Sequence, residues 1–274
     1  MRLVQLSEED LLEKSPTARS EVVGAVTPEQ LGKALADVKR WREAKLDIRT
    51  VLDASYPASL QTIFNRPPLL FIQGRWTNHL FGQSIAVVGT RRASDAGREQ
   101  ARLITRELVE AGFSIVSGLA QGIDTVAHTT ALENSGPTGA VIGTGIFRQF
   151  PKENAALAKD IIGVGGGILS QFFPEQPPTS WTFPMRNIVM SGLTLATVVI
   201  EAAETSGARL QARVALQHGR TVFLLRSLVE KHEWARRYVT DGAYGTRAIE
   251  IASAGEIIRP LGGDVALQEL QLTA

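Results

Sequence analysis

The chain has no cysteine among its 274 residues. Disulfide bonds, thiolate metal sites and cysteine nucleophiles are therefore excluded. None of the four histidines stands at a metal-ligand spacing such as HExxH, so we expect neither a metal ion nor a cofactor. No apolar run reaches the roughly 18 residues of a membrane span, and the beginning, MRLVQLSEED, lacks the apolar core of a signal peptide. These absences predict a cytoplasmic protein without membrane contact.

A marked excess of charge is also missing. Lysine and arginine number 29 and aspartate and glutamate 28, so the formal net charge is +1. Domains that bind nucleic acid by bulk electrostatics usually carry a marked basic excess, so any contact with nucleic acid must be local. Apolar residues make up 44% of the chain, which is enough to bury a core in one or two domains.

Two glycine-containing loops follow apolar runs near the middle of the chain. The first run, residues 85–88, breaks at residues 89–92, and the second run, residues 113–116, breaks at residues 117–124. A helical pattern separates the two, so the stretch predicts strand, loop, helix and strand. Both loops would then lie at the carboxyl ends of neighbouring parallel strands, where open α/β sheets bind ligands.

The chemistry of this sheet edge favours an anion. Helix N-termini present free N–H groups with a partial positive charge, and glycines let a phosphate approach the backbone. Arg91 and Arg92 add fixed charge. The first loop, however, is neither a GxGxxG fingerprint nor a P-loop. Spacing alone therefore leaves open whether the glycines bind a phosphate or only make tight turns.

The chain divides into three predicted parts. Residues 1–48 read as a small helical prefix, with a Ser-x-x-Asp capping pattern at LSEEDLLEK and a second helix that begins at Thr27 and Pro28. Residues 49–260 predict an α/β domain, an extended Rossmann-like, doubly wound, mostly parallel sheet with helices on both faces. Residues 261–274 are expected to be a frayed tail or a short partner-binding strand. For the prefix, a packing or dimer-facing role is favoured over DNA contact.

Prolines interrupt the segment that precedes the central domain. Residues 46–74 therefore read as short β segments rather than as a continuous helix. Residues 69–72 are expected to form an edge strand beside the main sheet. Residues 76–83 are polar and read as a linker.

Strands and helices alternate through the rest of the chain. We expect strands at 139–143, 194–200 and 221–225, helices at 155–162, 208–219 and 230–238, and closing segments at 248–251 and 254–258. The β-branched run at 194–200 is typical of a strand that is covered on both faces.

Five segments are expected to meet at the carboxyl edge of this sheet and to form a site for nucleic acid or phosphate. The predicted site residues supply amides, hydroxyls and cations: Gly89, Thr90, Arg91, Ser117, Gly118, Gly145, Lys152, Asn154, Arg186, Asn187, Ser206 and Gly207. Phe147 and Phe150 offer faces on which bases can stack, although phenylalanines are more often core residues. Single-stranded nucleic acid needs this combination of cations and aromatic faces.

Several charged or titratable side chains have structural alternatives. Arg91 can be a solvated surface arginine, and Arg186 can pair with Glu201 or Asp124. His128 is expected to be a hydrogen-bonded structural residue. Glu201 is the best acid–base candidate, but no serine lies in a GxSxG context, and no catalytic residue is predicted.

Five ordered motifs resemble the DprA/Smf family of DNA-processing proteins: VVGTRR, SGLAQGIDTVAH, AVIGTGIFRQFPKEN, FPMRN and VVIEAAETSGA. The resemblance covers roughly residues 50–258 of this chain. It implies a non-enzymatic protein that binds single-stranded DNA in the pocket at this edge and forms homodimers. It also implies loading of a RecA-type recombinase onto DNA taken up in natural transformation. By motif, the implied pocket residues are Arg91, Ser117, Lys152, Asn154, Arg186 and Asn187.

The chain also departs from the pattern of that family. Gln171 stands where an acidic residue is usual, residues 225–227 replace a Pro-Gly turn, and SGARLQA replaces an SGSLITA-like run. A shortened or diverged member with a role in defence is therefore an alternative to transformation. Two other functions stay open, a nucleotide-binding sensor or nucleotide hydrolase that uses the same pocket, and an interaction scaffold.

Overall fold

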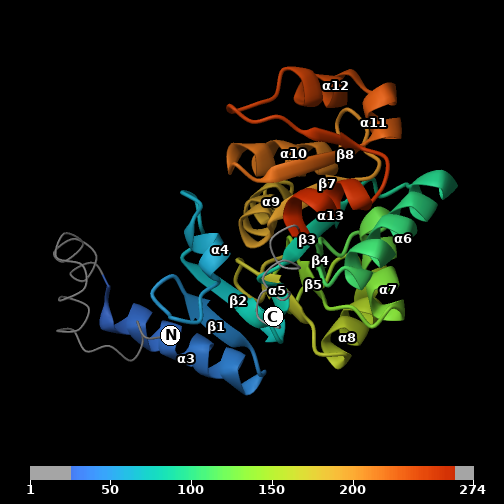
Figure 1. Cartoon of the computed structure of the whole chain (residues 1–274). Helices are drawn as coiled ribbons and strands as arrows, with labels where there is room; N and C mark the ends of the chain where they lie inside the picture. The colour runs from blue at the N-terminus through green and yellow to red at the C-terminus, as the bar shows by residue number, and fades with distance from the viewer. Residues whose placement is uncertain (1–25, 263–274) are drawn as a thin grey trace, which may run out of the picture.

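Nine strands form one sheet in residues 26–262, the part of the chain that the computed structural model describes (Figure 1). The expected cap in LSEEDLLEK and residues 263–274 of the expected tail lie outside this range. The strands are β1 (Asp47–Thr50), β2 (Leu69–Gly74), β3 (Ser84–Val88), β4 (Ser114–Ser117), β5 (Thr138–Val141), β6 (Gly167–Ser170), β7 (Ala196–Val199), β8 (Thr221–Leu225) and β9 (Ile249–Ile251).

The strand order, β1-β2-β6-β5-β4-β3-β7-β8-β9, confirms the predicted doubly wound sheet. In this order, the strands β6-β5-β4-β3-β7-β8-β9 all pair in parallel, whereas β2 pairs antiparallel with both β1 and β6. The chain first winds outward from β3 through β4, β5 and β6, and then crosses back to β7 on the other side of β3. The carboxyl ends of β3 and β7 therefore form the switch point, where such sheets leave a crevice for ligands.

Helices cover both faces of the sheet, as predicted. Those described are α3 (Pro28–Glu43), α4 (Ala58–Gln61), α5 (Asn78–Phe81), α6 (Asp95–Glu110), α7 (Ile123–Glu133), α8 (Ala155–Gly163), α9 (Thr182–Leu193), α10 (Gly207–Gln217), α11 (Arg226–Lys231), α12 (Glu233–Thr240) and α13 (Gly255–Gly262). In Figure 1, α6, α7 and α8 lie together along one face, and α9 and α10 lie along the other.

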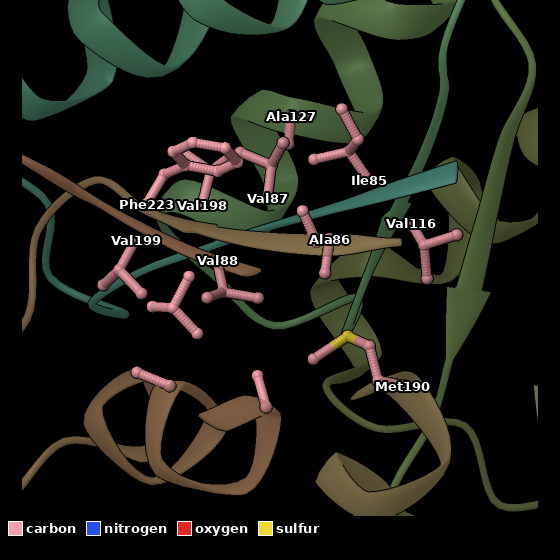
Figure 2. Close-up of a cluster of buried hydrophobic side chains, with 14 of the residues drawn as sticks. Ile85, Ala86, Val87, Val88, Val116, Ala127, Met190, Val198, Val199 and Phe223 are labelled. Atoms are coloured by element: carbon pink, nitrogen blue, oxygen red, sulfur yellow. The ribbon is translucent and has the colours of Figure 1, made fainter. Parts of the chain in front are cut away.

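The central strand β3 shows why the sheet forms here. All five of its residues are buried, since helices cover the strand from both sides. In Figure 2, Val87 points toward Ala127 of α7, whereas Ala86 lies on the side of Met190 of α9. Gly89 ends the strand where a Cβ atom would lie 2.4 Å from the Ile123 side chain, so only glycine lets α7 begin this close to β3.

Helix α3 packs on the sheet through one aromatic residue. The predicted cap is present, because the Thr27 hydroxyl accepts from the Gln30 amide and the Gln30 side chain accepts from the Thr27 amide. Trp41 is buried, and its ring lies edge-on to Phe71 of β2 with centroids 5.1 Å apart. The helix therefore packs on the sheet, while the choice between a packing or dimer-facing role and DNA contact stays a prediction.

Three expectations for the segment before β3 are wrong. Residues 58–61, expected to be β, form the short helix α4. Strand β2 is not an edge strand, because β1 pairs with its outer side. Residues 76–83 are not a polar linker, since Trp76 and Phe81 stack with ring centroids 4.2 Å apart and are buried under the sheet. Further on, the single helix expected at 230–238 is divided between α11 and α12.

His128 is a buried structural residue, as expected. Its Nδ1 atom lies 2.7 Å from the Thr138 hydroxyl, which itself donates to the carbonyl oxygen of Ile115 at 3.0 Å. Because the hydroxyl proton is used, Nδ1 carries the ring proton and donates it to Thr138. Nε2 has no hydrogen-bond partner within residues 26–262. Burial, with a smaller contribution from the charge of Arg186, lowers the pKa of His128 to about 3.

Acid should therefore destabilise the protein through His128. The unfolded chain takes up a proton as the pH falls below 6.5, whereas the native ring stays neutral until about pH 3. This proton uptake has no effect on stability above pH 6.5, and it lowers the free energy of unfolding by about 2 kcal/mol between pH 6.5 and 5. Urea unfolding at both pH values measures it. His128→Gln should lose about 2 kcal/mol less over this interval, and equal losses in the two proteins would show that the ring is not held neutral.

Candidate nucleic-acid interface

Two adjoining cavities lie at the switch point of the sheet. The first, here called the Phe150 hollow, has a volume of about 260 Å³ and is lined by Gly118, Phe150 and Pro151 among others. The second, the Thr90 hollow, has a volume of about 450 Å³ and is lined in part by Thr90, Asn187, Ser206, Gly207 and Gln211. Both are lined by Arg91, Ala120, Phe183 and Arg186. The two hollows therefore share one wall.

A cation and an aromatic ring form this shared wall. The guanidinium carbon of Arg91 lies 5.4 Å from the ring centroid of Phe183, within the range of a cation–π contact. The Phe183 ring in turn lies 6.0 Å from Phe150, which is 41% exposed. Arg91 is thus exposed but lies over a ring, and because it lines both hollows, its N–H groups can reach a ligand in either.

Arg186 is buried behind Arg91 and is only partly hydrogen-bonded. Its Nε donates to Oδ1 of Asn187 at 3.1 Å, and its Nη1 donates to the carbonyl oxygen of Val141 at 2.8 Å. Within the described residues the guanidinium makes no further hydrogen bond, so it keeps donors for a ligand. Gly118 provides the space, because a Cβ atom there would lie 1.7 Å from Nη1.

The buried carboxylate of Asp124 partly compensates this charge. Its Oδ2 accepts from the amides of Gly118 and Ala120 at 3.1 and 3.3 Å. Burial raises the pKa of Asp124, while the charge of Arg186 and the two amides oppose the rise. Burial likewise lowers the pKa of Arg186, and Asp124 opposes that change. Of the two predicted partners for Arg186, Asp124 is therefore the one whose charge acts on it, although the described residues contain no direct ion pair between the two.

Glu201 lines neither of the two hollows. Its Oε2 accepts from the amide and the hydroxyl of Ser94 at 3.0 and 3.1 Å, at the beginning of α6. Its backbone carbonyl accepts from the Thr90 amide at 2.7 Å. Glu201 therefore fixes the loop that carries Arg91, and its carboxylate stabilises the positive end of the α6 dipole.

Most of the predicted site residues come together around the two hollows. Those that line one or both are Gly89, Thr90, Arg91, Gly118, Phe150, Arg186, Asn187, Ser206 and Gly207. Ser206 caps α10 by accepting from the Arg209 amide, and Asn187 donates to the carbonyl oxygen of Gly207 at 3.3 Å. Segments from four different loops thus meet as predicted.

Three other predicted residues use their polar groups within the protein. The Ser117 hydroxyl donates to the carbonyl oxygen of Val87 at 2.6 Å, and Nδ2 of Asn154 donates to Leu119 and Thr125. The Gly145 amide donates to the carbonyl oxygen of Gln176 at 2.9 Å. Asn154 therefore supports the loop beneath Ala120, and its contact with a ligand stays a prediction, as do those of the other two residues.

The remaining two predicted residues lie on the surface near Phe150. Lys152 begins the 3-10 turn η1 (Lys152–Asn154) and is exposed, and Phe147 is 43% exposed. Neither has a contact that decides its role.

Gln211 was missed by sequence reasoning. It lines the Thr90 hollow and is 1% exposed, and its Oε1 has no hydrogen-bond partner within the described residues. The available signal is the pattern of α10, where a glutamine stands on the same buried face as Ala208, Ala212 and Ala215. A polar residue in an alanine-lined helix face is often placed there for a contact.

Neither metal binding nor membrane insertion has support in the described residues. No group of three or more histidine, cysteine, aspartate or glutamate side chains in residues 26–262 is placed to hold a metal ion. No helix in this range is long and apolar enough to span a membrane.

Known proteins are similar to this chain in sequence. DNA processing protein DprA of Bacillus subtilis is 37% identical over 183 residues, which cover 67% of this chain and 61% of the relative. Protein Smf of Escherichia coli is 41% identical over 170 residues, which cover 62% of this chain and 45% of the relative. The chain therefore spans about half to three fifths of the length of these relatives.

Two solved structures extend the likeness to three dimensions. The crystal structure of DprA from Streptococcus pneumoniae superposes with a TM-score of 0.71 at 31% identity, covering 92% of this chain and 86% of that protein. DNA processing protein A from Helicobacter pylori, which binds single-stranded DNA, shares the fold with a TM-score of 0.68 at 24% identity, covering 80% of this chain and 97% of that protein. The family model described as DNA recombination-mediator protein A matches residues 47–253. The chain belongs to the DNA recombination-mediator protein A family.

Proposed function

We propose that the protein binds single-stranded DNA in the Phe150 and Thr90 hollows and acts as a recombination mediator. In this role it protects the strand and helps to load a RecA-type recombinase, as a homodimer in the cytoplasm, in natural transformation or in a related DNA-processing or defence process. The observation that carries the proposal is the shared wall, where Arg91 lies over Phe183 and the buried Arg186 keeps free donors.

The chemistry of the two hollows suits an unpaired strand. Guanidinium groups bind phosphates through several N–H donors, and contacts of this kind position a strand without reading its sequence. Phe150 offers an exposed ring, and stacking of a base on an aromatic side chain is tolerant of sequence. In duplex DNA the base faces are stacked on one another, so the hollows should prefer single strands.

The hydrogen bonds of the two candidate carboxylates, Asp124 and Glu201, are consistent with a non-enzymatic role. Asp124 is buried and hydrogen-bonded to two loop amides, and Glu201 is hydrogen-bonded to Ser94. Each side chain therefore already has a structural role, and neither is poised to activate water.

A nucleotide-binding sensor or nucleotide hydrolase is the second candidate, favoured by the 450 Å³ volume of the Thr90 hollow. Ligand pockets for small molecules commonly measure about 300–1,000 Å³. A nucleoside phosphate at about 100 times its dissociation constant should stabilise the protein by roughly 2.7 kcal/mol. Thermal unfolding with a panel of nucleoside phosphates tests this candidate, and release of product from a stabilising nucleotide would indicate a hydrolase rather than a sensor.

Fluorescence anisotropy with a labelled oligothymidylate tests the leading proposal. We expect binding that weakens with salt, and a loss of about tenfold in Arg91→Ala, since a hydrogen bond to a charged group contributes about 1.5–3 kcal/mol. The slope of log K against log salt should also become shallower by about 0.7 for each phosphate contact removed. Arg106→Ala on the exposed side of α6 is the matched control. Equal binding of duplex and single strand, or no binding at low salt, would contradict the proposal.

A further inference from the structure

A third cavity continues the Thr90 hollow across the beginning of α10. This cavity, here called the α10–α12 groove, has a volume of about 710 Å³ and is lined by Arg209 and Arg213 of α10, Tyr238 of α12 and Tyr244 of the turn that follows. The groove and the Thr90 hollow are both lined by residues 205–207 and by Leu210. The three cavities therefore adjoin one another in a row, here called the track, from Phe150 to Tyr244.

The groove repeats the chemistry of the first two hollows. Nε of Arg213 donates to the Tyr244 hydroxyl at 2.9 Å, and its guanidinium carbon lies 6.0 Å from the centroid of that ring. Arg209 lies 5.7 Å from the ring centroid of Trp234, which packs edge-on to Tyr238. Arginines beside aromatic rings thus occur at both ends of the track.

The two arginines of the groove differ in their partners. Arg209 forms an ion pair with Glu204, so its charge is locally neutralised. Arg213 has no carboxylate partner within residues 26–262, and its hydrogen bond to Tyr244 leaves its remaining N–H groups available. Arg213 is therefore the cation of this groove that can bind a phosphate.

Tyr244 is exposed but held in place. Its side chain is 52% exposed, whereas the turn around it is closed by the Ala243–Thr246 bridge. The Thr246 hydroxyl lies 3.0 Å from the carbonyl oxygen of Ala243 and 3.3 Å from that of Leu216, so the turn packs against the end of α10. A ring in a fixed position binds a base with a smaller loss of side-chain entropy.

The Thr90 hollow also has a buried polar group without a partner. Gln211 is almost fully buried, lines the Thr90 hollow one turn beyond the α10 N-terminus, and has an Oε1 atom without a partner in the described residues. Such an acceptor can pair with a donor of a bound ligand. It indicates a ligand in the Thr90 hollow, which shares residues 205–207 with the groove.

We propose that a single strand held in the Thr90 hollow continues over the first turn of α10 into the α10–α12 groove, where a base stacks on Tyr244 and a phosphate contacts Arg213. The inference rests on the proposed function and extends its site. If so, the groove should contribute to affinity only for strands that are long enough to reach beyond the two hollows.

Oligothymidylates of about 5 and 15 nucleotides, within the usual range of single-strand site sizes, distinguish the two parts of the track. Arg213→Ala and Tyr244→Ala should each weaken the 15-mer about five- to tenfold and leave the 5-mer unchanged, since stacking of one base contributes on this scale. Tyr244→Phe should keep most of the 15-mer affinity, because the ring remains. Arg91→Ala should weaken both lengths. Arg237→Ala, on the exposed side of α12, is the control and should change neither.

Two results would overturn this inference while the proposed function stands. One is a wild-type 15-mer that binds no more tightly than the 5-mer. The other is an Arg213→Ala or Tyr244→Ala variant that binds the 15-mer as tightly as the wild type, or that weakens both lengths equally. If the wild-type protein binds neither length, the proposed function and this inference are both wrong.

Discussion

Gly118→Ala should fold and yet lose at least about tenfold in affinity for single-stranded oligonucleotides, because the donors of Arg186 would be displaced. The added methyl group would lie 1.7 Å from Nη1 and 2.5 Å from Cζ of Arg186, so the buried guanidinium must move. Movement breaks its hydrogen bonds to Asn187 and Val141 and turns its free donors away from the hollows. We also expect overpacking to cost about 1–3 kcal/mol in stability.

Anisotropy titration and thermal unfolding of the same variant measure the two effects. Gly163→Ala at the end of α8 is a matched control, because a methyl group there meets no atom within 4 Å. The control should bind like the wild type and be equally stable or slightly more stable. If Gly118→Ala bound single strands with unchanged affinity, Arg186 would not be a ligand-binding residue.

Asp124→Asn should destabilise the protein by about 3–5 kcal/mol, the usual cost of removing one partner from a buried charge pair. The change keeps the size of the side chain but leaves the buried Arg186 guanidinium without a compensating charge. It also places an amide group where Oδ2 accepts from Gly118 and Ala120. For a chain of this size the melting temperature should fall by about 10 °C.

The double variant Asp124→Asn/Arg186→Met tests the reason for this loss. Removing both charges should cost less than the sum of the two single changes, because neither charge is then left alone in the core. Chemical unfolding of the four proteins yields the coupling free energy. Additive effects within about 0.5 kcal/mol would mean that Asp124 and Arg186 do not stabilise each other.

The parallel part of the sheet was predictable because its strands are buried on both faces. Such strands appear as continuous apolar runs, as at 85–88 and 221–225, and each is followed by a helix of clear period. Strand β2 also begins with an apolar run, residues 69–72, and was predicted, whereas β1 has the mixed sequence DIRT, so its pairing outside β2 was missed. The helix α5 was missed because four residues, NHLF, are too few to show a helical period.

The candidate site was predictable as a place but not as a set of contacts. The carboxyl ends of parallel strands converge, so Thr90, Arg186 and Ser206 meet as expected. Sequence position does not tell which way a side chain points. Asn154, for example, donates to the carbonyl oxygen of Leu119 inside the protein and lines neither hollow. Gln211 lies on the buried, alanine-rich face of α10, and the sequence does not show that this face also borders the Thr90 hollow.

A crystal structure with a bound oligothymidylate of about six nucleotides is the most direct test of single-strand binding in the two hollows. We expect the strand to run through the Phe150 and Thr90 hollows, with a phosphate within hydrogen-bond distance of Arg91 or Arg186 and a base against Phe150. An oligonucleotide bound on another face, with both hollows empty, would contradict the proposed function.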